Sequence, residues 1–376
     1  MKVAVVAESF LPSVNGVVRS VEMVLRHLER LRCEVLVLAP ATSESRAPSA
    51  VSGATVVRLP AAPLVGYPDI RIALTGIGRI RSLISDFAPD VVHLASPFEL
   101  GWRAARAAAQ LGVPAVAVYQ TDVPGYLRRY GLPLLENWAW QRVTDIHGAA
   151  ARTLAPSSAA VAQLTARGVP RVRLWARGVD AEAFHPRNRD AALRAGFAPC
   201  GERIIGYVGR LAAEKQVADL AAVADIPGTR LVIVGDGPER PALEAALPSA
   251  VFTGMLTGSQ LSAAMASLDV FVHPGELETF GQTIQEAMAS GVPVVATGRG
   301  GPLDLVDHSR TGWLYRPGDL SDLRGRVSDL VGDDAKRAAF ASAARAGVAG
   351  RTWPALCGQL MRHYDEVRAE QALLPR

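Results

Sequence analysis

The sequence predicts an α/β fold made of two doubly wound halves, each with a parallel sheet covered by helices. Short apolar runs alternate with helical hydrophobic patterns twice along the 376 residues. A chain of this length exceeds one ordinary hydrophobic core, and a stretch carrying Gly178 and Pro186 separates the two alternations. We therefore expect an N-terminal Rossmann-like domain at 1–172, a linker at 173–190 and a C-terminal Rossmann-like domain at 191–351.

The first half begins with a buried strand at 2–7 and a helix at 18–31, whose Val and Leu residues share one face. The loop between them lacks the G-x-G-x-x-G sequence of dinucleotide-binding folds. Gly16 at the helix start can let a phosphate approach the backbone closely, or can simply form a turn. Further strands are expected at 34–39, 55–60, 90–95, 114–119 and 152–156.

Asp122 follows one of these strands, and function in doubly wound sheets gathers at the carboxyl ends of strands. The loops 8–17, 96–101 and 120–126 are therefore of interest. The Asp122 carboxylate can orient a sugar hydroxyl or an acceptor nucleophile. The alternative is that it caps a helix or turn.

Two segments of the first half, 70–84 and 126–147, combine apolar and arginine-rich positions at helical spacing. The net charge of +4 is also uneven, because the first 172 residues carry +6 and the remainder −2. Basic amphipathic helices of this kind can lie on an anionic membrane surface, or can pack on the sheet and expose their charged face to water. Both interpretations stay open.

The second half is expected to have strands at 203–209, 230–235, 250–253, 269–273 and 292–296. Arg210 and Lys215 follow the first of these strands and precede a helical pattern. Two cations at that position can bind a diphosphate leaving group. Glycine-containing turns end the next strands, and backbone groups near Met255 could form hydrogen bonds with the edge of a nucleotide base.

The stretch from Gly275 to Glu286 combines two carboxylates, Glu278 and Glu286, with the start of a helix. Glu278 lies at the strand-to-helix turn and Glu286 within the helix, where two turns cover about 11 Å. Free N–H groups at the helix start suit an anion. Carboxylate, anion site and carboxylate in this order suit a sugar–diphosphate–ribose ligand, although two Glu residues at this spacing also occur by chance.

Composition limits the other possibilities. Hydrophobic residues make up 49% and charged residues 20%, and no apolar run is long enough to span a bilayer. The three cysteines, Cys33, Cys200 and Cys357, are far apart and fit a reducing cytoplasm. We expect no cofactor, no metal site and no nucleic-acid partner. The final helix, within 352–376, is long enough to pack back on the first domain.

Taken in order, these features resemble the GT-B glycosyltransferases and, more narrowly, the retaining enzymes of family 4. The most specific parts are Asn15-Gly16-Val17, Gly209-Arg210-Leu211 with Lys215, and Glu278 to Glu286. Four other stretches are similar to actinobacterial GDP-mannose-dependent α-mannosyltransferases, which act on glycolipid acceptors. They are Ala7 to Pro12, His93 to Pro97, Tyr119 to Pro124 and Trp175 to Asp180.

The resemblance implies a role for each matching residue. Arg210 and Lys215 would hold the donor diphosphate, and Gly16 would approach it from the first, acceptor-binding domain. Glu278 would bind the sugar hydroxyls. The remaining donor contacts implied are the backbones of Phe280, Gly281 and Met255, and the Glu286 carboxylate on the ribose.

One departure from the family concerns the loop at 120–122. Many family members have a His there, where this chain has Gln120 and Asp122. Asp122 therefore either replaces the imidazole or only positions the substrate.

The resemblance also implies a clamped activated sugar in a cleft between the two domains, its pyrophosphate neutralised by side chains and helix ends. The expected function is transfer of a hexose, most specifically mannose from GDP-mannose, to a glycolipid of the phosphatidylinositol mannoside or glucuronosyl-diacylglycerol type. The expected place is the cytoplasmic face of the plasma membrane. The alternatives are a nucleotide-sugar epimerase, a UDP-sugar-dependent transferase and a non-catalytic binding protein.

Overall fold

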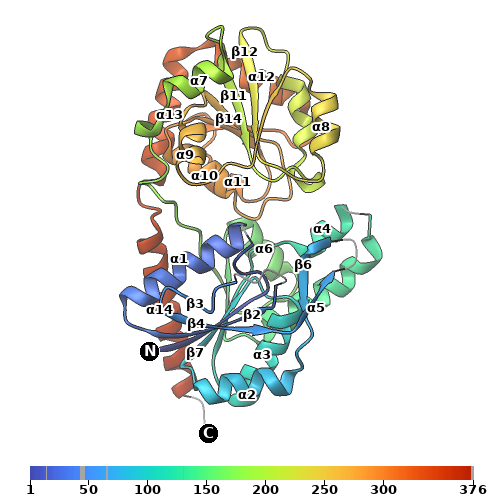
Figure 1. The fold of residues 1–376 in the computed structure, drawn as a ribbon, viewed down its shortest axis with the longest axis vertical. Coiled ribbons are helices and arrows are strands. Elements are labelled where there is room, and N and C mark those ends of the chain that lie inside the picture. Colours follow the sequence, from blue (N-terminus) through green and yellow to red (C-terminus); the bar gives the residue numbers. More distant parts are fainter. Residues whose placement is uncertain (14, 43–46, 65–66, 130, 374–376) are drawn as a thin grey trace. The chain divides into compact units, whose positions relative to one another are not determined.

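Two units divide the chain, and each has its own parallel sheet (Figure 1). The computed structural model describes residues 1–13, 15–42, 47–64, 67–129 and 131–373. The first unit consists of Met1–Arg128, Leu132–Arg177 and Pro354–Arg376, and the second of Arg129–Gly131 and Gly178–Trp353. The chain thus enters the second unit inside the predicted linker and leaves it close to the predicted boundary at 351.

The main sheet of the first unit has the strand order β10-β9-β8-β7-β1-β2-β4-β3, and only the β3–β4 pair is antiparallel. Its strands are β1 (Lys2–Ala7), β2 (Glu34–Pro40), β3 (Ala50–Val51), β4 (Ala54–Leu59), β7 (Val91–Ala95), β8 (Ala115–Val118), β9 (Arg152–Ala155) and β10 (Val172–Leu174). A separate antiparallel pair joins β5 (Ala61–Leu64) and β6 (Tyr67–Ala73). The helices are α1 (Gly16–Arg30), α2 (Ile77–Phe87), α3 (Glu99–Leu111), α4 (Val123–Arg129), the 3-10 helix η1 (Pro133–Leu135), α5 (Glu136–Ala149), α6 (Ser158–Ala166) and α14 (Trp353–Ala372).

Alternation along the strands distributes their side chains between two helical layers. Val6 and Leu94 belong to the core that includes residues of α2 and α3. His93, one position earlier on β7, meets α14 on the other face, where the Tyr364 hydroxyl lies 2.7 Å from His93 Nδ1. The indole of Trp175 also donates to the Leu356 carbonyl at 2.9 Å. The last helix, red in Figure 1, is therefore part of the first unit's core.

The second unit has six parallel strands in the order β13-β12-β11-β14-β15-β16. They are β11 (Arg203–Val208), β12 (Thr229–Val234), β13 (Val251–Gly254), β14 (Val270–His273), β15 (Val294–Thr297) and β16 (Gly312–Tyr315), the last of which the sequence analysis did not predict. The helices are η2 (Pro186–Asn188), α7 (Ala191–Phe197), η3 (Ala213–Lys215), η4 (Val217–Val223), α8 (Arg240–Ala246), α9 (Gly258–Ala266), α10 (Gln282–Ala289), α11 (Pro302–Leu305), α12 (Leu320–Gly332) and α13 (Asp334–Val348). The predicted doubly wound architecture is confirmed in both units.

The two predicted basic amphipathic helices are wrong as continuous elements. The segment 70–84 is split, because β6 pairs with β5 as far as Ala73 and α2 begins only at Ile77. The segment 126–147 is divided into the end of α4, the short η1 and α5. Gly131, with φ of +75°, and Pro133 fall between α4 and α5, where neither favours a continuous helix. Tyr130 and the Ile70 side chain lie outside the described residues.

Candidate active site

The strand order of the second unit reverses between β11 and β14, and the loops after these two strands carry the predicted site. Strands β12 and β13 extend the sheet on one side of β11, while β15 and β16 extend it beyond β14. Lys215 ends η3 after β11, and Glu278 follows β14. Because all six strands are parallel, both loops leave the same edge of the sheet at the reversal point, where ligands of doubly wound folds bind.

Lys215 and Glu278 form an ion pair at this point. Lys215 Nζ lies 2.6 Å from Glu278 Oε2, and the two side chains are 20% and 15% exposed. His273 Nε2 lies 3.5 Å from the same oxygen, and the Phe280 N–H donates to Oε1 at 3.3 Å. Burial alone would raise the pKa of Glu278, but the Lys215 ammonium and the His273 contact lower this pKa well below its ordinary value. Glu278 is therefore an ionised carboxylate.

Backbone contacts fix the loop that carries Glu278. The Gly301 N–H donates to the Glu278 carbonyl at 2.8 Å. Gly300 has φ of +68°, and a Cβ there would lie 2.6 Å from the same carbonyl oxygen. On the other side, Gln216 Oε1 accepts from the Glu276 N–H at 2.9 Å. A glycine is thus required at position 300 for the loops after β14 and β15 to approach each other.

Helix α10 continues this loop, and its N-terminus lies where the sequence predicts an anion site. The N-cap residue before it, Gly281, has φ of +98°, and among the described residues no side chain caps this end. The first N–H groups of α10 are therefore available to an anion, which the helix dipole also favours. Glu286 is a buried residue within α10, 5% exposed, and its Oε1 accepts from Gln282 Nε2 at 3.3 Å.

Close backbone packing joins the loops after β11, β12 and β13. A Cβ on Gly235 would lie 1.9 Å from the Gly209 carbonyl oxygen, and the Gly235 N–H donates to the Gly254 carbonyl at 2.9 Å. Arg210 is exposed beside this packing, and its carbonyl accepts from the Tyr207 hydroxyl at 3.0 Å. Met255 directly follows β13 and is 66% exposed.

The structure thus brings the predicted donor residues of the second unit to one sheet edge. These residues are Arg210, Lys215, Met255, Glu278, Phe280, Gly281 and Glu286. The two remaining predicted residues, Gly16 and Asp122, belong to the first unit.

Gly16 starts α1 at the carboxyl end of β1. Asn15 caps this helix, since its Oδ1 accepts from the Val17 and Val18 N–H groups, each at 3.0 Å. A Cβ on Gly16 would lie 2.9 Å from Arg177 Nη1. The observed close approach to Gly16 is therefore made by a guanidinium, which also donates to Gln120 Oε1 at 2.7 Å.

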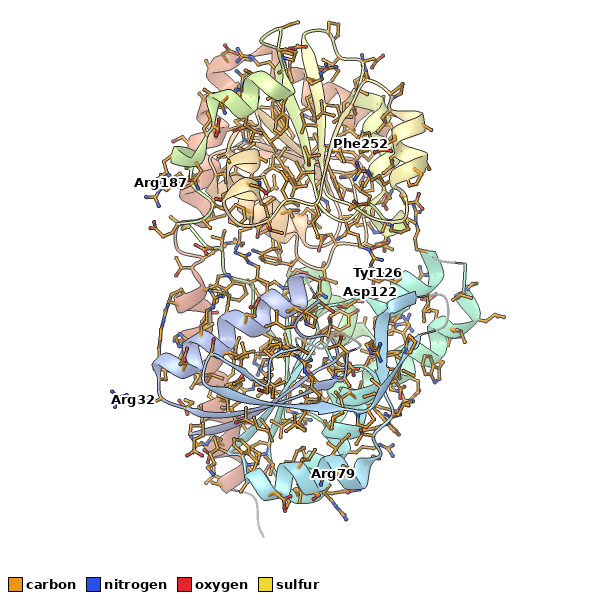
Figure 2. All side chains as sticks on the ribbon, viewed as in Figure 1. Arg32, Arg79, Asp122, Tyr126, Arg187 and Phe252 are labelled. Atoms are coloured by element: carbon orange, nitrogen blue, oxygen red, sulfur yellow. The ribbon has the colours of Figure 1, made fainter. Side chains whose placement is uncertain are left out.

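Asp122 stands at the start of α4, beside Tyr126 (Figure 2). Its Oδ1 accepts from the Gly125 N–H at 3.0 Å and from the Tyr119 hydroxyl at 3.2 Å. Asp122 is 8% exposed, and burial together with this carboxylate holds the pKa of Tyr119 well above its ordinary value. These contacts correspond to the capping alternative, and they give the carboxylate a fixed orientation.

Two residues of these sites were missed by sequence reasoning. His273 was not among the predicted site residues, yet it contacts Glu278. Arg177 was noted only within a family-like stretch, although it is buried and joins the Gly16 and Gln120 loops. A useful signal for His273 would have been its place as the final residue of an apolar strand whose following loop carries the carboxylate.

Comparison with known proteins follows the same division of the chain. The family model described as Glycosyltransferase Family 4 matches residues 14–183, and the one described as Glycosyl transferases group 1 matches residues 188–347. A GDP-mannose-dependent alpha-mannosyltransferase of Mycobacterium tuberculosis is 48% identical over 99% of this chain and 98% of its own length. The chain belongs to glycosyltransferase family 4. A protein of the same name from Mycolicibacterium smegmatis is 49% identical over 99% of each chain.

A more distant relative is the alpha-monoglucosyldiacylglycerol synthase of Streptococcus pneumoniae, which is 24% identical over 88% of this chain and 78% of its own length. Among solved structures, the Anabaena protein HepE in complex with UDP matches with a TM-score of 0.81 and 20% identity, over 97% of this chain and 100% of that one. This structural similarity shows that the chain has the GT-B fold.

Proposed function

We propose that this protein is a retaining α-mannosyltransferase that moves mannose from GDP-mannose to a glycolipid acceptor. The observation that carries the proposal is the group at the second unit's sheet edge, where Lys215 and Glu278 meet beside the open N-terminus of α10. This group suits a sugar, a diphosphate and a ribose in that order. Support for mannose and guanine comes from the names of the relatives that are 48–49% identical over nearly the whole chain.

The chemistry of sugar transfer indicates a role for each charged group of the site. Cleavage of the bond between the sugar C1 and the phosphate oxygen builds positive charge on the sugar and negative charge on the diphosphate. Arg210, Lys215 and the N-terminus of α10 stabilise the negative charge. The ionised Glu278 carboxylate holds sugar hydroxyls and Glu286 the ribose.

Retention would follow from front-face attack. The acceptor hydroxyl forms the new bond to C1 on the face that the diphosphate leaves, and its proton passes to the departing phosphate oxygen. No protein nucleophile takes part in this scheme. In the first unit, Asp122 would position the acceptor.

The test is a donor screen with the purified protein. GDP should raise the melting temperature more than UDP or ADP, and GDP-mannose with a diacylglycerol- or phosphatidylinositol-based glycolipid should yield an α-linked product by NMR. A larger stabilisation by UDP would favour the UDP-sugar alternative. Sugar isomerisation without acceptor would favour the epimerase, since a transferase should show at most slow hydrolysis.

Metal independence belongs to the same proposal. Side chains and a helix end, in place of a divalent cation, would neutralise the diphosphate. Turnover should therefore survive EDTA, and recovery of lost activity by Mg²⁺ or Mn²⁺ would contradict this part of the proposal.

The membrane-facing surface we propose is the apolar segment around η1 in the first unit. Leu134 is 93% exposed, and Leu132, Leu135 and Trp138 are 44–46% exposed. Exposed large apolar side chains grouped in this way suit insertion into a lipid interface. No helix among the described residues is both long and apolar enough to cross a bilayer. We propose peripheral attachment to the inner face of the plasma membrane, aided by the basic charge of this part of the chain.

A vesicle sedimentation experiment tests this surface. Leu134→Ser with Leu135→Ser should reduce binding to vesicles that contain anionic phospholipid, while the nucleotide-induced thermal shift stays unchanged. Leu303→Ser is a matched control, because Leu303 is 49% exposed in the second unit. Equal binding by all three proteins would contradict the assignment.

A further inference from the structure

We propose that His273 is a positioning residue for Glu278: its imidazole donates from Nε2 and fixes the carboxylate that grips the donor sugar. The inference rests on the proposed function for the role of Glu278. It concerns a histidine outside the predicted site, placed where β14 ends and the loop to Glu278 begins.

The His273 ring has a fixed place. His273 is 2% exposed, and its ring has two aromatic neighbours, with centroid distances of 6.4 Å to Tyr207 and 6.5 Å to Phe271. Backbone pairing of His273 with Ala296 of β15 anchors it further. A ring held in this way can orient a neighbour at low entropic cost, since it has little rotamer freedom left to lose.

The surroundings of the ring determine its tautomer. His273 Nε2 faces Glu278 Oε2 at 3.5 Å, whereas Nδ1 is buried and has no hydrogen-bond partner among the described residues. A carboxylate only accepts hydrogen bonds, so Nε2 must carry the proton for the contact to be favourable. A second proton on Nδ1 would bury an unsatisfied charged donor, which costs more than an unsatisfied neutral acceptor. The neutral Nε2–H form follows.

His273 and Lys215 then have different roles toward the Glu278 carboxylate. Both contact Oε2, while Oε1 accepts a hydrogen bond from the Phe280 N–H at 3.3 Å. Lys215 has a second task in the proposed reaction, because its ammonium also faces the departing diphosphate. His273 has no such task and can hold Glu278 in one orientation as the charge on the diphosphate develops. Glu278 Oε1 then presents toward the sugar hydroxyls.

The experiment compares His273→Asn with His273→Gln. The Gln side chain places its amide N–H donor at about the same distance from the backbone as His Nε2, whereas the shorter Asn side chain does not reach that far. We expect His273→Asn to lower kcat about tenfold, as for loss of one weak hydrogen bond to a charged group, with the GDP dissociation constant unchanged. His273→Gln should recover most of kcat. Equal losses in both variants, or none in either, would overturn the inference.

A double-mutant cycle separates positioning from general damage. In a Glu278→Gln background, His273→Asn should cause little further loss of turnover, since the charged partner is already gone. Additive losses would overturn the inference. Val272→Ala is the matched control, because Val272 is fully buried on the same strand. It should lower the melting temperature and leave kcat unchanged.

A ligand-free measurement keeps this inference separate from the proposed function. In ¹⁵N-histidine spectra of the intact protein, His273 should show the neutral Nε2–H tautomer and should shift on Glu278→Gln. An Nδ1–H tautomer, or no response to Glu278→Gln, would overturn the pairing. Absence of mannose transfer by the wild-type protein, with these spectra as expected, would remove the proposed function and leave the pairing intact.

Discussion

Lys215→Ala should separate catalysis from nucleotide binding. The substitution removes a cation 2.6 Å from Glu278, and both partners of the pair are more than three-quarters buried. A single stabilising group aimed at developing transition-state charge is worth about 10²–10³ in kcat. In the proposed site, bound GDP would still contact the α10 N-terminus, Arg210 and Glu286. We therefore expect kcat to fall by about that factor, and the GDP dissociation constant to rise by less than about tenfold.

The same variant has a predictable cost in stability. Breaking a fully buried pair costs about 3–5 kcal/mol, and an exposed pair about 0–1 kcal/mol. The partial exposure of Lys215 and Glu278 places the cost between these limits, at roughly 1–3 kcal/mol. The assay temperature must therefore lie well below the melting temperature of the variant.

Initial rates at saturating donor, together with calorimetric titration of GDP, measure the two effects. Lys336→Ala is the matched control, since Lys336 pairs with Asp329 at 2.5 Å in the same unit and lies outside the candidate site. Equal loss of kcat and of GDP affinity in Lys215→Ala would refute the reasoning, as would kcat values equal to those of Lys336→Ala.

Three further predictions concern the framework. Burial raises the pKa of Glu8 from 4.5 to about 7, so its stabilising contribution is complete below pH 4.5 and is lost as pH rises toward 7. In the Glu8→Gln variant, the urea midpoint of unfolding should fall less steeply between pH 5 and pH 8 than in the wild type. An equally steep fall would contradict this prediction. Gly235→Ala should cost roughly 1–3 kcal/mol or more, because Gly235 has φ of +142° and a Cβ would meet the Gly209 carbonyl oxygen; an unchanged melting temperature would contradict this. Tyr364→Phe should cost about 1–3 kcal/mol by leaving buried His93 Nδ1 without its hydroxyl partner, which thermal unfolding against wild type will show or refute.

The sequence was most informative where periodicity and strand ends determine position. Buried parallel strands appear as continuous apolar runs, so the loops that bear Lys215 and Glu278 could be placed at strand ends, and the parallel topology then brings them together. In the second unit, β16 (Gly312–Tyr315) was not predicted, and in the first unit β3, β5, β6 and β10 were not predicted.

The rest depended on contacts that apolar periodicity does not specify. His273 meets Glu278 only because the loop after β14 turns back, and apolar periodicity carries no information about that turn. Gly16 presents a similar case, since the guanidinium against it comes from Arg177. The split of 70–84 arose from pairing of β6 with β5, a tertiary preference that overrides helical spacing.

The return of α14 to the first unit has a consequence for biosynthesis. A nascent chain emerges from its N-terminus, yet α14, which contacts the His93 face of the first sheet, is made only after the whole second unit. Before α14 is made, the apolar surface of β1 and β7 that it contacts stays exposed while the whole second unit is translated. We expect ribosome-bound intermediates to depend on chaperones at this face, and the packing of α14 on the first unit to end this dependence.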